Sequence, residues 1–262
     1  MKWHRILAVI YRHCYESRRN LNRVTETLFW PIQNVLLWGF FTVYLTRHNG
    51  LSPGLGNDLL GAAILWGMFN AFQRDLATGF MEELWSRNLL NLFSTPLSIS
   101  EYMTGLIMLN FLKAMVGLLF ASLIAFFCYA YNILPSLPAF LPFLFNLMLF
   151  SLSIGLIITG SMIRYSANIS TLAWSFAGLL MPISCVFYPV STLPAWLRPL
   201  AMSLPTTHSF EAMRQLILHG QFSYAHFFWG LLLDLAYLIV AVIFFRQMFA
   251  SARSRGFLAK QL

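Results

Sequence analysis

The chain has 262 residues, of which 58% are hydrophobic and only 10% are charged. Soluble domains carry about 25% charged residues, so a water-exposed surface of this size would be short of charge. The composition therefore excludes an ordinary soluble domain and favours a protein that exposes apolar surface to lipid. The formal net charge of +8 does not indicate nucleic-acid binding, because the basic residues lie in short segments between apolar runs.

Residues 1–27 precede the first long apolar run and contain a basic helical pattern. The charged residues that a helix would place on one face are Arg5, Arg12, Glu16, Arg19 and Arg23. We expect an amphipathic helix that lies in the membrane interface with this face toward the cytoplasm, and a solvated helix is the alternative. The density of charge also indicates that this segment is not a cleavable signal peptide.

Six apolar runs follow, and most reach the roughly 18 residues that a spanning helix needs. They cover residues 28–46, 57–73, 102–131, 139–163, 169–190 and 222–249. We therefore expect an all-α membrane protein with six transmembrane helices and no soluble domain. The third run would form a helix of about 45 Å against a hydrocarbon core of about 30 Å, so it should tilt or begin below the membrane.

The distribution of Lys and Arg predicts the orientation. With six spans both termini share one side, and 13 of the 17 basic residues fall on that side. Only Arg47, Arg198 and Arg214 fall on the other side, and Lys113 lies within a span. Basic residues gather on the cytoplasmic side of membrane proteins, so we expect both termini to be cytoplasmic.

Two loops have features of their own. The inner loop at 74–101 has apolar residues at helical spacing, and we expect a short amphipathic helix at 81–94. The outer segment at 189–225 is interrupted by four prolines, and we expect short helices over 191–220 that dip into the membrane from outside. Half-inserted segments of this kind are stable only when their backbone groups bond within helices or to protein.

The motifs of common enzymes are absent. The sequence contains no HExxH, no GxSxG and no phosphate-binding loop. Cys14, Cys128 and Cys185 show no CxxC spacing, so neither a disulfide nor a metal site is predicted.

Some side chains within the spans are candidates for function. Asp234 lies about 12 Å inside the last span, where an ionisable group is costly and marks a functional site by default; a structural carboxylate is the equal alternative. Four aromatic residues of the first two runs could line a path for an amphipathic substrate or belong to the interfacial belt. They are Trp38, Phe41, Trp66 and Phe69.

This arrangement resembles the permease subunit of type-2 ABC exporters, the ABC-2 type transporter family. A basic N-terminal helix before six spans is the first shared feature. The second is EELWSRNLLNLFSTPLSISEYMTG (Glu82 to Gly105), in which Pro96 follows a short helix. The third and most specific is YPVSTLPAWLRPLAMSLPTTHSFEAMRQ (Tyr188 to Gln215), which is similar to the family's pattern of spaced prolines, Leu-Pro and Glu-x-x-Arg. The family's external re-entrant helices would then contain Trp196, His208, Glu211 and Arg214.

The resemblance implies a transport subunit that is not itself an enzyme. Two permeases, expected to be identical, would pair in the bacterial cytoplasmic (inner) membrane, each with a separate ABC ATPase that binds ATP and Mg. The substrate exported would be amphipathic: a lipid-linked glycan, a lipid or a drug. Residues 81–94 would be the coupling helix that docks on the ATPase, with contacts from Glu82, Glu83, Trp85 and Arg87.

Two other functions remain open from the sequence. An ion channel or proton-coupled carrier would use Asp234 and need no ATPase. A membrane enzyme acting on lipids would use His208, Glu211 and Arg214, which are spaced at i, i+3 and i+6 on one helix.

Overall fold

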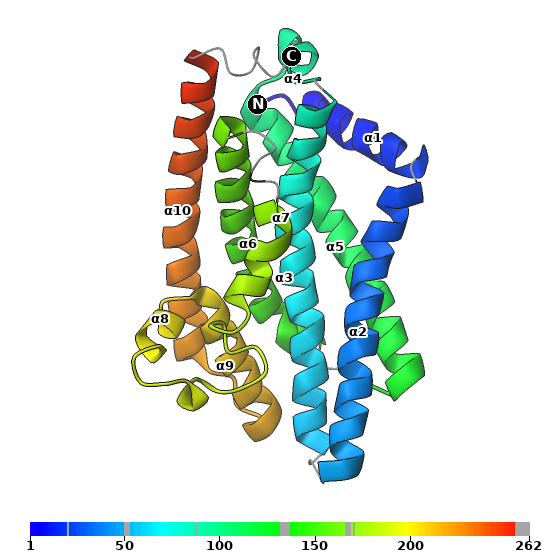
Figure 1. Ribbon diagram of the computed structural model, residues 1–262, viewed down its shortest axis with the longest axis vertical. Coiled ribbons are helices and arrows are strands. Elements are labelled where there is room, and N and C mark those ends of the chain that lie inside the picture. Colours follow the sequence, from blue (N-terminus) through cyan, green and yellow to red (C-terminus); the bar gives the residue numbers. More distant parts are fainter. Residues whose placement is uncertain are drawn as a thin grey trace.

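The computed structural model describes residues 1–19, 21–49, 53–86, 88–131, 137–165, 169 and 171–254. Over these ranges the chain forms helices and no strand, which confirms the all-α prediction. The long helices run along the longest axis of the molecule (Figure 1). We call the end of the bundle with α1 and α4 the α1 end, and the opposite end, with α8 and α9, the α9 end.

The helices follow in chain order. They are α1 (Trp3–Arg19), α2 (Leu21–Asn49), α3 (Pro53–Trp85), α4 (Leu89–Ser94), α5 (Ile99–Tyr129), α6 (Leu137–Tyr165), α7 (Thr171–Leu180), a 3-10 turn at Val190–Thr192, α8 (Arg198–Met202), α9 (Pro205–His219) and α10 (Tyr224–Ser254).

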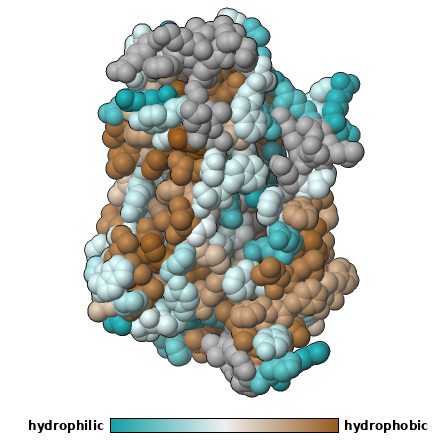
Figure 2. Space-filling model, in the orientation of Figure 1, coloured by the Kyte–Doolittle hydropathy of each residue, from teal (hydrophilic) through white to brown (hydrophobic). Residues whose placement is uncertain are grey.

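Within the part of the chain that the structure describes, four helices are long and apolar enough to cross a membrane. They are α2, α5, α6 and α10, over Leu28–His48, Ile99–Tyr129, Pro138–Tyr165 and Tyr224–Ser254. These four correspond to the first, third, fourth and sixth apolar runs. Figure 2 shows broad hydrophobic areas on the side of the bundle between its two ends, as a lipid-facing surface requires.

The second and fifth runs differ from this pattern. The second becomes α3, which has 33 residues but carries charged residues along its length. The fifth yields α7, whose 10 residues span only about 15 Å before the chain turns at Met181.

Helix α3 extends well past the point where an inner loop was expected. Gly79 lies inside α3, and an added Cβ there would meet Leu106 of α5 at 3.4 Å. The helix therefore continues because its last turns pack on α5. The expected helix at 81–94 is consequently divided between the last turn of α3 and the separate helix α4.

Helix α1 lies across the end of the bundle (Figure 1) and packs on α5. Its buried residues Ile6, Val9 and His13 share one face. Gly105 of α5 allows the close approach, because a Cβ there would lie 2.9 Å from Val9 Cβ. The segment expected at 1–27 is divided between α1 and the first residues of α2.

The Pro-rich segment before α10 forms the short helices that were expected there. Pro205 occupies the first turn of α9, where its missing N–H costs nothing. Gly220 ends α9 in the left-handed conformation, with φ of 66°, and its N–H binds Leu216 O.

Candidate functional site

Glu83, in the last turn of α3, joins three elements at the α1 end. Its carboxylate lies 2.8 Å from Nη2 of Arg12 in α1, and Asn88, just before α4, donates to it at 2.8 Å. His13 Nε2 lies 3.8 Å away. Glu83 is only 2% exposed, so its carboxylate interacts with groups of this chain. These contacts hold α1 and α4 against α3.

Glu101 makes a second junction at the start of α5. Its carboxylate accepts the backbone N–H of Lys2 at 2.7 Å and lies 3.4 Å from Arg5 Nη1. It also closes a capping box with Ser98, in which each side chain bonds the other's backbone N–H. The two junctions together fix the start and the middle of α1 to the bundle.

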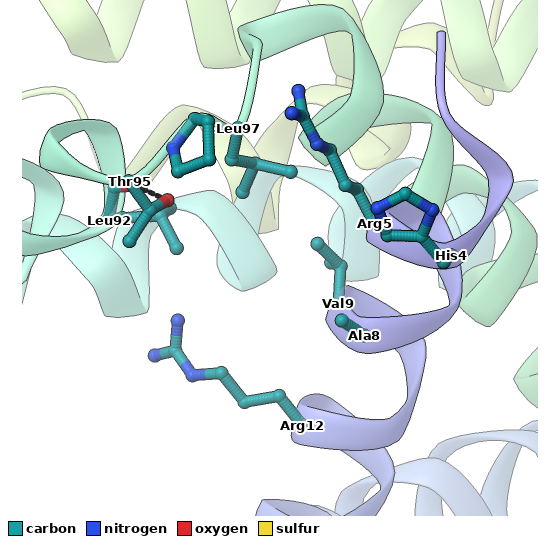
Figure 3. A pocket seen from close by; sticks show the side chains of 9 residues that line it. His4, Arg5, Ala8, Val9, Arg12, Leu92, Thr95 and Leu97 are labelled. Carbon is teal, nitrogen blue, oxygen red and sulfur yellow. Dashed lines mark hydrogen bonds between the residues drawn. The ribbon is translucent and has the colours of Figure 1, made fainter.

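A groove of about 420 Å³ lies between α1 and the connection from α4 to α5. Figure 3 shows Ala8, Val9 and Arg12 of α1 on one side and Leu92, Thr95 and Leu97 on the other. The basic residues of the lining all come from the α1 side, and the opposite side is mainly apolar. The residues that line the groove are His4, Arg5, Ala8, Val9, Arg12, Leu92, Thr95, Pro96 and Leu97.

The four residues expected to contact an ATPase lie in different environments. Trp85 is 58% exposed at the end of α3, so it is available to a partner. Glu82 is partly exposed, whereas Glu83 is buried in its junction. Arg87 lies outside the described residues. The sequence prediction missed Asn88 and Glu101; the Ser-x-x-Glu pattern of a capping box was the available signal for Glu101.

Arg214 of α9 is the centre of a polar network at the α9 end. Its Nε lies 3.4 Å from Asp58 in α3, and its Nη1 lies 3.2 Å from Glu211. Its Nη2 donates to Cys185 O at 3.1 Å, and Glu211 accepts Val190 N–H at 2.7 Å. The Glu-x-x-Arg pair therefore ties α9 to α3 and to the segment after α7. Asp58 was not singled out from the sequence.

His208 has different partners from Glu211 and Arg214. Its Nε2 lies 2.9 Å from Met202 O, and its Nδ1 lies 3.1 Å from Nδ1 of His226 in α10. Since only Nε2–H can donate to a carbonyl oxygen, Nδ1 of His208 accepts from His226. Burial lowers the pKa of His208, in spite of the bond to Met202. Of the three residues proposed for a lipid enzyme, Glu211 and Arg214 pair with each other, whereas His208 bonds elsewhere. Trp196 is exposed near α8.

Asp234 is fully buried on α10. Neither of its carboxylate oxygens has a hydrogen-bond partner among the residues that the structure describes. A buried polar group without a partner costs free energy. The buried carboxyl of Asp234 is therefore expected to destabilise the fold.

The four aromatic candidates divide into two pairs. Trp66 and Phe69 are buried and stacked with their ring centres 4.7 Å apart, so they belong to the core. Trp38 stacks on Phe187, after α7, with ring centres 3.8 Å apart, and Phe41 is exposed. Only Trp38 and Phe41 are therefore near the open surface.

Long apolar helices, buried ionic junctions at both ends and a groove at the α1 end define a multi-pass helical membrane protein. The chain belongs to the ABC-2 type transporter family, whose model matches residues 11–218. This confirms the resemblance read from the sequence. The protein is therefore a transmembrane component of a transporter, and the family in general works with an ABC ATPase. No curated protein matches the chain.

Proposed function

We propose that this chain is the permease of an ATP-driven exporter in the bacterial inner membrane. Two copies would pair, and each would dock on a separate ABC ATPase that binds ATP and Mg. The substrate would be an amphipathic molecule such as a lipid-linked glycan, a lipid or a drug. The chain itself would bind no cofactor.

Six membrane crossings agree best with the path of the chain. Helix α3 is about 50 Å long and runs from the α9 end to the α1 end (Figure 1), so it would be the second crossing. The fifth would consist of α7 and the turns that follow it. Helices α8 and α9 would then re-enter from the outer side, with their backbone groups bonded within the protein.

The positive charge of α1 supports a cytoplasmic α1 end. Helix α1 ends with Arg18 and Arg19, and Arg253 lies in the last turn of α10, which finishes at the same end (Figure 1). Basic residues favour the cytoplasmic side. Tags placed at the N- and C-termini should therefore both react with reagents confined to the cytoplasm, and tags on opposite faces would overturn the six-span arrangement.

The observation that carries the docking proposal is the groove between α1 and the α4–α5 connection (Figure 3). Its walls belong to elements that the Glu83 and Glu101 junctions hold together. A force applied by an ATPase at α4 would therefore reach α1, α3 and α5. On this proposal Glu82, Trp85 and Arg87 contact the ATPase, while Glu83 stiffens the docking site from within.

Purification in mild detergent tests this docking. The tagged permease should retain an ATP-hydrolysing partner, and Ala8→Trp or Leu97→Trp should abolish capture because the indole fills the groove. Tyr11→Trp is the matched control, since Tyr11 is an exposed residue of α1 outside the groove. Equal capture by all three variants would show that the ATPase docks elsewhere.

A carrier that uses Asp234 without an ATPase is the second candidate, because the buried carboxyl lacks partners. It predicts uptake or export in proteoliposomes that contain the permease alone and are driven by a proton gradient. Asp234→Asn should abolish that transport. Transport that requires ATP and a partner, and that survives Asp234→Asn, would exclude the carrier.

A further inference from the structure

Arg74 is a buried cation within α3. It lies eleven residues before Trp85, about 16 Å from the α1 end of the helix. Its Nε and Nη2 lie 3.3 Å and 3.2 Å from the same oxygen of Asp75. Asp75 is the next residue of the same helix, and the contacts that the structure shows between the two side chains use this one oxygen. A cation within a membrane helix is costly and marks a functional site by default.

Two indole rings flank the Arg74 guanidinium. Its Cζ lies 5.5 Å from the ring centre of Trp30 in α2 and 5.6 Å from that of Trp174 in α7. Both distances are within the range of a cation–π interaction. Trp30 and Trp174 remain 39% and 42% exposed, so neither residue is enclosed by the bundle.

The positions of these three residues are set by contacts that do not need the Arg74 charge. The neighbouring Gln73 donates to the backbone oxygen of Ala173 at 3.2 Å, which fixes α7 to α3 at this level. Helices α2 and α7 each pack on α3 and make at most a marginal contact with each other. All three helices are on the face toward the viewer in Figure 1. The two indoles therefore come from two helices that pack separately on α3, and both reach the guanidinium of Arg74.

We propose that Arg74, Trp30 and Trp174 form a recognition site for the phosphate-bearing headgroup of an amphipathic substrate. The guanidinium binds the phosphate, for which its planar donors are suited, and the phosphate replaces the single oxygen of Asp75. The indoles hold the ring or chain attached to the phosphate. This rests on the proposed export function and narrows its substrate class to phosphate-linked lipids or glycolipids; cationic drugs are disfavoured because Arg74 repels them.

Titration of the purified permease in dodecyl maltoside micelles tests the site. Dodecyl phosphate is the probe, with dodecyltrimethylammonium as the cationic counterpart and inorganic phosphate as the anion without a chain. Tryptophan emission should change saturably with dodecyl phosphate. That change should be reduced in Trp30→Phe and Trp174→Phe, and inorganic phosphate should bind far more weakly if the chain is part of what the site recognises.

Arg74→Gln should weaken binding of dodecyl phosphate about tenfold or more, since a bond to a charged group is lost. Arg164→Gln is the matched control, because Arg164 also lies over an aromatic ring, that of its neighbour Tyr165, and it should bind normally. Arg74→Lys keeps the charge and should give an intermediate affinity; it serves as the test if Arg74→Gln does not elute as a folded protein. Equal affinity in wild type, Arg74→Gln and Arg74→Lys, or stronger binding of dodecyltrimethylammonium, would overturn the proposal.

The same preparations separate this proposal from the export function. A wild-type permease that captures an ATPase but does not bind dodecyl phosphate would refute the substrate class and leave export intact. One that binds dodecyl phosphate through Arg74 but never captures an ATPase would support the site and refute ATP-driven export.

Discussion

Arg12 of α1 reaches Glu83 of α3 at 2.8 Å, although 71 residues separate them in the chain. The pair is asymmetric, because the side chain of Glu83 is 2% exposed and that of Arg12 is 34% exposed. Removing the acid therefore leaves a cation that water can still solvate, whereas removing the cation leaves a buried carboxylate. When the cation is removed, Asn88 still donates to that carboxylate.

Substitution at this junction should release α1. We expect Arg12→Ala to lower the free energy of unfolding by about 2 kcal/mol, less than the 3–5 kcal/mol typical of a fully buried pair. The double variant Arg12→Ala, Glu83→Gln should recover part of the loss, since no buried charge remains unpaired. Denaturation in mixed micelles measures both, and Tyr11→Ala on the exposed side of α1 should have little effect. A double variant less stable than Arg12→Ala would contradict the pairing.

At the opposite end, Arg214 should be energetically coupled to Asp58. A double-mutant cycle with Arg214→Gln and Asp58→Asn should give a coupling free energy of about 1 kcal/mol or more, because both side chains are largely buried and lie 3.4 Å apart. The stability of the four proteins in mixed micelles provides the cycle. Additive effects would mean that α9 is held mainly by its other contacts.

Much of the fold could be predicted because apolar runs of sufficient length leave the chain few alternatives in lipid. The end of α3 could not, since Arg74 and Asp75 resemble the start of a loop in sequence. In the structure, Arg74 is accommodated by Trp30 and Trp174, which come from two other helices. A local pattern cannot show partners of this kind.

The segments that form the candidate site could also be predicted from the sequence, but the contacts of their residues could not. The inner segment and the outer Glu-x-x-Arg pair were identified, but their roles depend on distant partners. Glu83 resembles a solvated acid on an amphipathic helix until Arg12 is brought to it. Trp66 and Phe69 look the same in sequence as Trp38 and Phe41, and only packing against α6 and α9 makes the first pair core residues.

Acidification should weaken the contact between α9 and α10. Burial lowers the pKa of His208 below its usual value, about 6.5, so the unfolded chain binds a proton that the folded protein does not. Stability should therefore be full above about pH 6.5 and should fall as the pH is lowered through that value. Thermal unfolding in detergent between pH 5 and 8 measures this. His208→Gln should have a flatter profile, and a profile as steep as that of wild type would show that His208 does not carry the effect.

Two glycines give a matched test of how closely α1 is packed. A Cβ at Gly105 of α5 would lie 2.9 Å from Val9 Cβ and 3.3 Å from the backbone oxygen of Ile6, and backbone cannot move aside easily. Gly105→Ala should therefore cost about 1–3 kcal/mol of stability and displace α1, which limited proteolysis of the N-terminal segment would detect. Gly178→Ala in α7 meets nothing within 4 Å and should be neutral or stabilising by up to about 1 kcal/mol. Because the two changes add the same methyl group to a helix, equal stabilities would mean that α1 does not rest on Gly105.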